Sequence, residues 1–300
     1  MDQLANGIEL GKTFFKIFDI TYSLTSTSEA VETATKRVIE DFNKDNVIYL
    51  ELRSTPRAEK NMSKKNYLEA MIRGVQHCKI HFPNILVKLL ISVNRNETIE
   101  SAKENIELAI EYSKKFPNLI LGIDLSGNPT KSKFIDYIDI LNKARSEGLK
   151  ISIHCGEVVD NQEVKSILDF HPDRIGHGTC IHESLGGDQN NWDELLKKKI
   201  PVEICITSNI KCKTVNSYDE HHFKFLYENK HPITLCTDDK GVFNCSLSDE
   251  FEIVKNKYSL NDNELWSLSY NSINYIFGSE LEKSNLRNSL TEWKEKNNIK

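Results

Sequence analysis

Residues 151–158, near the middle of the chain, combine an alternating apolar pattern with one histidine and one glutamate. The sequence Ile-Ser-Ile-His-Cys-Gly-Glu-Val is typical of a buried strand that ends near His154 and is followed by Glu157. A neutral imidazole can bind a divalent metal, and a nearby carboxylate can exchange protons with a water that the metal activates. The stretch therefore predicts metal-assisted proton chemistry, although a lone histidine at a strand end is more often a surface residue or a hydrogen-bonded one.

Polar residues also follow most of the other short apolar runs. They occupy residues 53–57, Asn94, and residues 124–129, 176–179, 207–209 and 237–240. Taken singly, each group could be a helix cap, a plain turn or a satisfied core histidine. Taken together they favour one functional site, because the loops after the strands of a (β/α) barrel all lie on one face.

The elements that would position these residues are short apolar runs alternating with helical patterns. Strands are expected at residues 47–52, 86–93, 119–125, 149–153, 174–176, 202–206 and 233–236. This alternation, with fully apolar strands, predicts a parallel sheet covered by helices on both faces. No glycine-rich dinucleotide turn follows any strand, so an α/β (β/α)8 TIM barrel of the metal-dependent hydrolase type is favoured over an open doubly wound sheet.

Helices are expected at both ends of this alternating region. A capping box of Ser26 and Glu29 predicts a helix that continues to about residue 42. After the last strand, helical patterns at residues 247–258, 262–277 and 280–297 predict C-terminal helices. No linker or low-complexity tract interrupts the chain, so residues 1–300 are expected to form one barrel domain.

Composition narrows the class of protein. The 300 residues are 39% hydrophobic and 28% charged, as in ordinary globular proteins. The net charge of -5 argues against binding a nucleic acid polymer through overall charge, and no apolar run reaches the roughly 18 residues of a membrane span. Seven scattered cysteines without a C-x-x-C pair indicate reduced thiols and a cytoplasmic protein. We expect a monomer whose partner is a small molecule.

Three motifs resemble the signatures of a known enzyme family in order and spacing. Ile-His154-Cys-Gly-Glu157, Arg174-Ile-Gly-His177-Gly and Thr237-Asp238-Asp239 are similar to those of the adenosine and AMP deaminase family of metal-dependent amidohydrolases. The resemblance spans nearly the whole chain. Residues 49–57 and 237–243 look more like the branch that removes methylamine from N6-methyl-AMP, yielding IMP, than like adenosine deaminases themselves.

The resemblance implies roles for individual residues. His154 and Asp238 would bind one zinc ion per subunit, Glu157 would protonate the purine ring, and His177 and Asp238 would act on the attacking water. Asp239 and the backbone of Gly127 would hold the two sides of the base. The remaining residues expected to bind substrate are Tyr22, Ser54, Thr55, Pro56, Arg57 and Asn94.

The cations of the strand-end loops bear on the choice between nucleotide and nucleoside. Five are expected there, namely Arg53, Arg57, Lys211, Lys213 and Lys240, with hydroxyl donors from Ser54, Thr55, Thr207 and Ser208. Any one cation on a loop is as often simply solvated. As a group they favour a phosphate monoester, and hence a purine nucleotide.

One departure from the family pattern concerns the metal ligands. The family's first strand ends in His-x-His, which supplies two more ligands, and none of the nine histidines here has that spacing. Seven expected strands also fall one short of a barrel. We therefore expect that an N-terminal segment is lacking, that the metal site is incomplete and that the chain as written is nearly inactive. A catalytically inactive purine-nucleotide-binding isoform, an adenosine deaminase and another amidohydrolase chemistry remain the alternatives.

Overall fold

The computed structural model describes residues 17–299, and its centre is a seven-stranded parallel sheet. The strands pair in sequence order, β1-β2-β3-β4-β5-β6-β7, and each pair is parallel. Their bounds are β1 (Tyr49–Ser54), β2 (Leu86–Asn94), β3 (Ile120–Ser126), β4 (Lys150–Cys155), β5 (Arg174–His177), β6 (Val202–Ile204) and β7 (Ile233–Leu235). The seven strands expected from the sequence are confirmed, although β6 ends at Ile204 instead of residue 206, and at least one helix joins each pair of neighbours.

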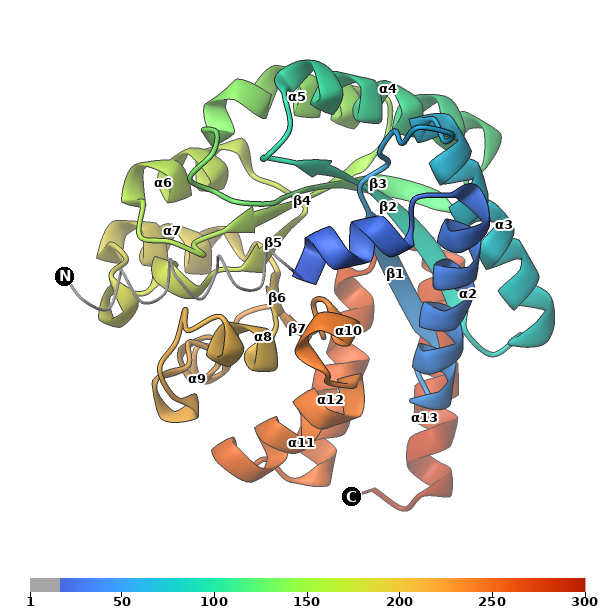
Figure 1. Ribbon diagram of the computed structural model, residues 1–300. Coiled ribbons are helices and arrows are strands. Elements are labelled where there is room, and N and C mark those ends of the chain that lie inside the picture. The colour runs from blue at the N-terminus through green and yellow to red at the C-terminus, as the bar shows by residue number, and fades with distance from the viewer. Residues whose placement is uncertain (1–16, 300) are drawn as a thin grey trace.

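The sheet curls about a common axis, with helices along its outer face (Figure 1). The crossover helices are α3 (Lys64–His81), α4 (Ile99–Lys115), α5 (Ile138–Ser146), α6 (Asn161–Phe170), α7 (Gln189–Lys198), α8 (Ile206–Lys211) and α9 (Phe223–Glu228). The short helix α10 (Lys240–Phe243) follows β7. Strands β4 and β5 are buried along almost their whole length, as expected where helices cover one face and side chains fill the other. This arrangement confirms the TIM-barrel class.

The two outer strands of the sheet do not pair with each other. Within residues 17–299, β1 pairs only with β2, and β7 pairs only with β6. A cavity of about 1930 Å³ runs along this seam and is lined by side chains of both strands, among them Leu50, Arg53 and Leu235. The seam reaches the strand ends, because Asp238 and Asp239 also line the cavity.

The first long helix begins later than the sequence predicted. Helix α2 (Ser28–Lys44) is capped by Thr27, not by Ser26. Thr27 takes the extended backbone, and its hydroxyl accepts a hydrogen bond of 3.2 Å from the backbone N–H of Ala30. The capping-box spacing is therefore wrong by one residue, because either hydroxyl can cap and the backbone conformation selects between them.

The C-terminal helices are confirmed, with one shorter than expected. They are α11 (Leu247–Tyr258), α12 (Asp262–Ser272) and α13 (Glu280–Lys296). Helix α12 was expected to continue to residue 277, but a 3-10 turn, η5 (Ile273–Tyr275), follows it directly. Of the helices in the described part of the chain, none combines the length and apolar character needed to cross a bilayer. All seven cysteines are free thiols.

Candidate active site

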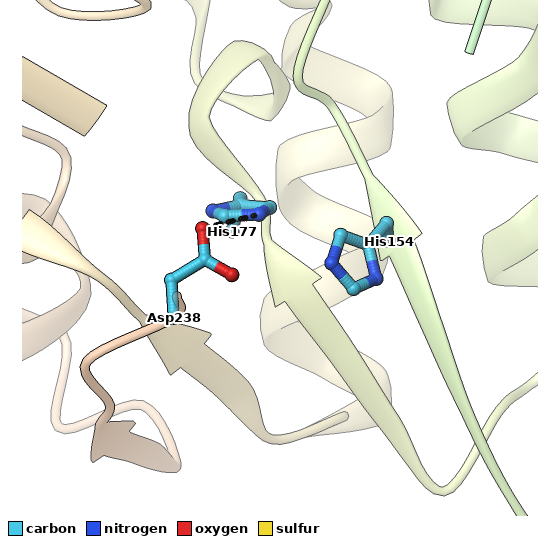
Figure 2. Close-up of side chains that lie close together, drawn as sticks. All are labelled: His154, His177 and Asp238. Atoms are coloured by element: carbon cyan, nitrogen blue, oxygen red, sulfur yellow. Dashed lines mark ion pairs between the residues drawn. The ribbon is translucent and has the colours of Figure 1, made fainter. Parts of the chain in front are cut away.

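Three side chains expected to perform chemistry meet at the C-terminal edge of the sheet. His154 lies on β4, His177 ends β5 and Asp238 follows β7. One potential ligand atom of each lies within 4.8 Å of those of the other two. Figure 2 shows the three side chains turned toward a shared space. Residues 84 positions apart in the sequence are thus brought together by the curvature of the sheet.

The backbone is strained at two members of this cluster. His177 has φ 61° and Asp238 has φ 53°, both in the left-handed region although neither is glycine. Such a conformation costs about 1–3 kcal/mol per residue and persists where the surrounding structure holds it. His177 is the last residue of β5, and Asp238 lies three residues after the end of β7, so the strain turns two side chains near strand ends into the site.

Glu157 lies close enough to share this space. Its Oε1 atom is 3.8 Å from Nε2 of His177, and Asp238 Oδ2 lies at the same distance from that nitrogen. Both separations are longer than a hydrogen bond, so Glu157, His177 and Asp238 are not hydrogen-bonded to one another. They can instead act together on a small molecule placed between them.

His154 meets the requirements of a metal ligand. It is buried, and its Nδ1 atom has no hydrogen-bond partner, although Asp124 Oδ1 lies 3.3 Å away without hydrogen-bond alignment. Burial alone would lower the pKa of His154, but the Asp124 carboxylate raises it to about 9. A metal must displace that proton to bind the ring. The two imidazoles and the carboxylate therefore fit a divalent ion that accepts nitrogen and oxygen ligands.

Arg53 has a different place from the one expected. It lies within β1 rather than on the loop, and its guanidinium contacts Glu203 and Asp238 at 3.1 Å each and Asp124 at 3.4 Å. This side chain is therefore occupied by carboxylates and is not available to a phosphate in this structure. The alternation of Glu51 and Arg53 on one strand was the only sequence signal that both point inward.

Asp239 borders the cluster as the residue that immediately precedes α10. Burial and the neighbouring Asp238 carboxylate raise the pKa of Asp239 to about 7. A carboxyl group that holds its proton near neutral pH can donate as well as accept a hydrogen bond. This suits contact with a ring nitrogen of a heterocycle.

A second group of expected residues meets across the mouth of the site. The helical segment 17–24 carries Tyr22, and Figure 1 shows this dark blue segment before α2. Arg57 lies over the Tyr22 ring at 4.6 Å and donates to the carbonyl of Thr25 at 2.7 Å. Ser54 shares a hydrogen bond of 2.8 Å with Tyr67, whose ring also faces Arg57.

Gly127 and Asn94 lie against each other at the ends of β3 and β2. Gly127 has φ +92°, and a Cβ atom built there would fall 2.2 Å from Asn94 Oδ1. Only glycine fits this close approach, which leaves the Gly127 backbone accessible beside the strand ends. Thr55 and Pro56 follow β1 directly, with Thr55 partly exposed and Pro56 buried.

Two other expected phosphate cations are engaged elsewhere. Lys211 donates to the carbonyl of Phe243, and Lys240 lies 3.3 Å from the carbonyl of Asp41. These bonds tie α8 and α2 to the loop after β7. Arg57 lies with the other substrate candidates, because it contacts the Tyr22 ring and the Thr25 carbonyl.

The sequence as a whole matches the adenosine deaminase family over residues 5–293. The chain belongs to this family. Among curated relatives, the N6-methyl-AMP deaminase of Homo sapiens is 43% identical over 276 residues, which cover 91% of this chain and 78% of that protein. An adenosine deaminase-like protein of Drosophila melanogaster is 42% identical over 270 residues, or 90% of this chain and 78% of its own length.

Solved structures agree with this assignment. Arabidopsis ADAL complexed with IMP superposes with a TM-score of 0.87 at 39% identity, covering 94% of this chain and 83% of that one. The adenine deaminase of Arthrobacter aurescens, at 19% identity, has a TM-score of 0.79 and shares the fold. Members of this deaminase family are metal-dependent hydrolases, so this chain is classed as a hydrolytic deaminase with a candidate metal site at His154, His177 and Asp238.

Proposed function

We propose that this protein, as its own cells produce it, hydrolyses N6-methyl-AMP to IMP and methylamine and that its metal is zinc. The observation that carries the proposal is the meeting of His154, His177 and Asp238 with Glu157 beside them, in a chain about 40% identical to N6-methyl-AMP deaminases. In the reaction the oxygen of water bonds to carbon 6 of the purine, and the bond from carbon 6 to the amine nitrogen breaks. The free thiols favour a cytoplasmic location, and we propose a monomer.

His154 and Asp238 would hold the zinc ion. Zinc bound by such ligands lowers the pKa of a coordinated water to about 7 and so supplies a nucleophile at neutral pH. Arg53 holds Asp238 through Oδ1, and Ser208 donates to Oδ2 at 2.8 Å. These two bonds fix the direction in which the carboxylate faces the reacting water.

Glu157 would supply the proton that the purine needs. Protonation of the ring nitrogen next to carbon 6 makes that carbon more electrophilic, and positioned acids of this kind contribute about 10²–10⁴-fold. Glu157 is partly exposed and has no described bond to a neighbouring residue other than the 3.8 Å approach to His177. Its carboxyl is therefore free to turn toward a bound base.

The base would be held by Asp239 on one side and by the Gly127 backbone on the other. A carboxyl of Asp239 that keeps its proton near pH 7 can donate to an acceptor nitrogen of the imidazole half of the purine. Asn94 contacts Gly127 and would set the depth of the site at that side. Both contacts recognise the purine ring itself, which every adenine nucleotide contains.

The phosphate would be held at the mouth. Arg57 lies there with the hydroxyl groups of Tyr22, Ser54 and Thr55, and Pro56 makes the intervening backbone rigid. Arg57 presents a planar set of donors suited to a phosphate monoester. Binding would require this guanidinium to exchange its contacts with the Thr25 carbonyl, and with Glu59 Oε1 at 3.2 Å, for phosphate oxygens.

The proposal is tested on protein isolated as its own cells produce it, with the zinc content measured by mass spectrometry. Methylamine release from N6-methyl-AMP is compared with ammonia release from adenosine and AMP. We expect N6-methyl-AMP to be the preferred substrate. If zinc-containing protein binds the nucleotide but releases no amine, the chain is a nucleotide-binding protein and the proposal is wrong.

The same preparation tests the nucleotide preference. Two or three charge-assisted hydrogen bonds of about 1.5–3 kcal/mol each predict that kcat/KM for N6-methyl-AMP exceeds that for N6-methyladenosine by several hundredfold. Arg57→Met should reduce this ratio, whereas Lys165→Met, on the outer surface of α6, should not. Equal kcat/KM for nucleotide and nucleoside would contradict the assignment of Arg57.

A further inference from the structure

The ring of His177 is held from behind by Asn209, a residue on α8 with no assigned role. The Asn209 amide nitrogen lies 3.2 Å from His177 Nδ1, and both side chains are buried. Distance alone does not show which partner donates, because the amide can be turned and the imidazole has two neutral tautomers. The contacts behind Asn209 remove that ambiguity.

The chain of contacts begins at a backbone donor. The N–H of Phe223 can only donate, and it lies 3.0 Å from His221 Nδ1, which therefore accepts. Burial, with His222 and His177 nearby, holds the pKa of His221 well below its usual value, so the ring is neutral. Its single proton is then on Nε2, which lies 3.1 Å from Asn209 Oδ1 and donates to that oxygen.

The orientation of the amide follows. With its oxygen engaged by His221, Asn209 turns its N–H toward His177, and an N–H donor fits only an unprotonated Nδ1. We infer that the series Phe223 N–H, His221 and Asn209 fixes His177 in the tautomer that carries its proton on Nε2. That nitrogen is the one facing Glu157 and Asp238.

A second histidine holds the backbone of the same residue. His222 Nε2 donates to the carbonyl of His177 at 2.8 Å, next to the strained φ of 61°. Two adjacent residues thus hold His177. His221 orients its ring through Asn209, and His222 bonds its backbone carbonyl. Asn209, His221 and His222 are positioning residues, since their described contacts act on His177 and on one another.

This arrangement separates two histidines that look equivalent in the cluster. With its Nε2 protonated, His177 presents a hydrogen-bond donor to the site and offers no lone pair there to a metal. His154 has an unpartnered buried nitrogen and is the ligand. The inference rests on the proposed function in assigning His177 to the attacking water, because an N–H donor orients the oxygen of that water.

The tautomer is measured directly by long-range proton–nitrogen spectra of ¹⁵N-labelled protein, both zinc-loaded and metal-free. His177 is assigned from the resonance that disappears in His177→Gln. We expect Nδ1 to be of the unprotonated type and Nε2 of the protonated type in both forms. A protonated Nδ1 in the zinc-loaded protein would make His177 a ligand and overturn the inference.

Variants of Asn209 and His221 supply a second readout. Asn209→Asp replaces the donor by an acceptor of the same shape, so Nδ1 should become protonated and kcat should fall roughly 10- to 100-fold, with KM little changed. Asn190→Asp makes the same change on the surface of α7 and should alter neither quantity. An unprotonated Nδ1 in folded Asn209→Asp protein would contradict the inference.

His221→Gln keeps an N–H near the position of Nε2 and should retain the wild-type tautomer, whereas His221→Leu should lose it.

The spectra do not depend on turnover, so the proposed activity and the proposed tautomer can fail separately. Absence of amine release with the expected tautomer would reject the proposed activity and leave the positioning of His177 intact. Amine release with a protonated Nδ1 would reject the positioning and leave the proposed activity intact.

Discussion

Two layers of buried charge lie inside the curled sheet, and they differ in how far their bonding capacity is used. In the lower layer, Arg174 bonds Glu203 at 2.7 Å, the Tyr275 carbonyl at 2.9 Å, and Glu51. In the upper layer, His154 keeps a buried nitrogen without a hydrogen bond, and the carboxylates stand 3.8 Å from His177. Arg53 joins the layers, because it contacts both Glu203 and Asp238.

This difference shows that buried charge alone does not identify a ligand-binding site. Charges that satisfy one another hold strands together, whereas charges left short of partners can accept a ligand. Every acceptor of Glu51 is engaged, by Arg174, Tyr49 and the Phe277 N–H. The upper layer has unused capacity at the strand ends, where ligands bind in barrels.

The largest effect is expected from breaking the lower layer. Arg174→Met leaves two buried carboxylates without their main partner, which costs about 3–5 kcal/mol in the free energy of unfolding. The change should be measured by denaturant unfolding. Lys150→Met removes an exposed pair with Asp173 at 2.8 Å and should cost at most about 1 kcal/mol. Equal effects of the two variants would mean that the lower layer contributes no more than a surface pair.

A smaller effect, on turnover alone, is expected in the upper layer. Glu157→Gln should lower kcat by at least roughly 10²-fold, the scale of a lost general acid. Zinc content and the unfolding free energy should stay at the wild-type value, because Glu157 is neither a proposed ligand nor part of the bonded network. Glu183→Gln, an exposed change, is the matched control. Near-normal turnover of Glu157→Gln would remove this residue from the mechanism.

The smallest effect is expected in how the free energy of unfolding depends on pH, through Glu203 of the lower layer. Burial alone would raise the pKa of Glu203, but Arg174 and Arg53 outweigh burial and lower it. A lowered pKa contributes stability that is present above the unfolded value of about 4.3 and is lost as pH falls through the folded value.

Glu203→Gln should therefore be less stable than wild type at pH 7, and the difference should shrink as pH falls below about 4. Unfolding free energies of both proteins across this range measure it. Glu252→Gln, at an exposed position of α11, should show a difference that stays small at every pH. A difference for Glu203→Gln that is constant with pH would show that the carboxylate gains nothing from its two arginines.

Periodicity predicted the elements and the polar groups at the strand ends, whereas the family resemblance supplied the roles of individual residues. Each apolar run is a local property, and the polar group after it marks the strand end, so His154, His177 and Asp238 could be assigned to one face before their distances were known. The C-terminal helices followed in the same way. Errors occurred where two neighbouring residues had equal propensity, as at Ser26 and Thr27.

Only the tertiary structure decided which polar groups bond to one another. Arg53 resembles a loop cation in sequence, yet it meets Glu203, 150 residues away, because β1 and β6 both direct side chains into the barrel. Asn209 and His221 carried no signal of their relation to His177, since a hydrogen bond between distant segments leaves no local period. The sequence determined which chemistry is available, and packing determined which atoms keep unused bonding capacity.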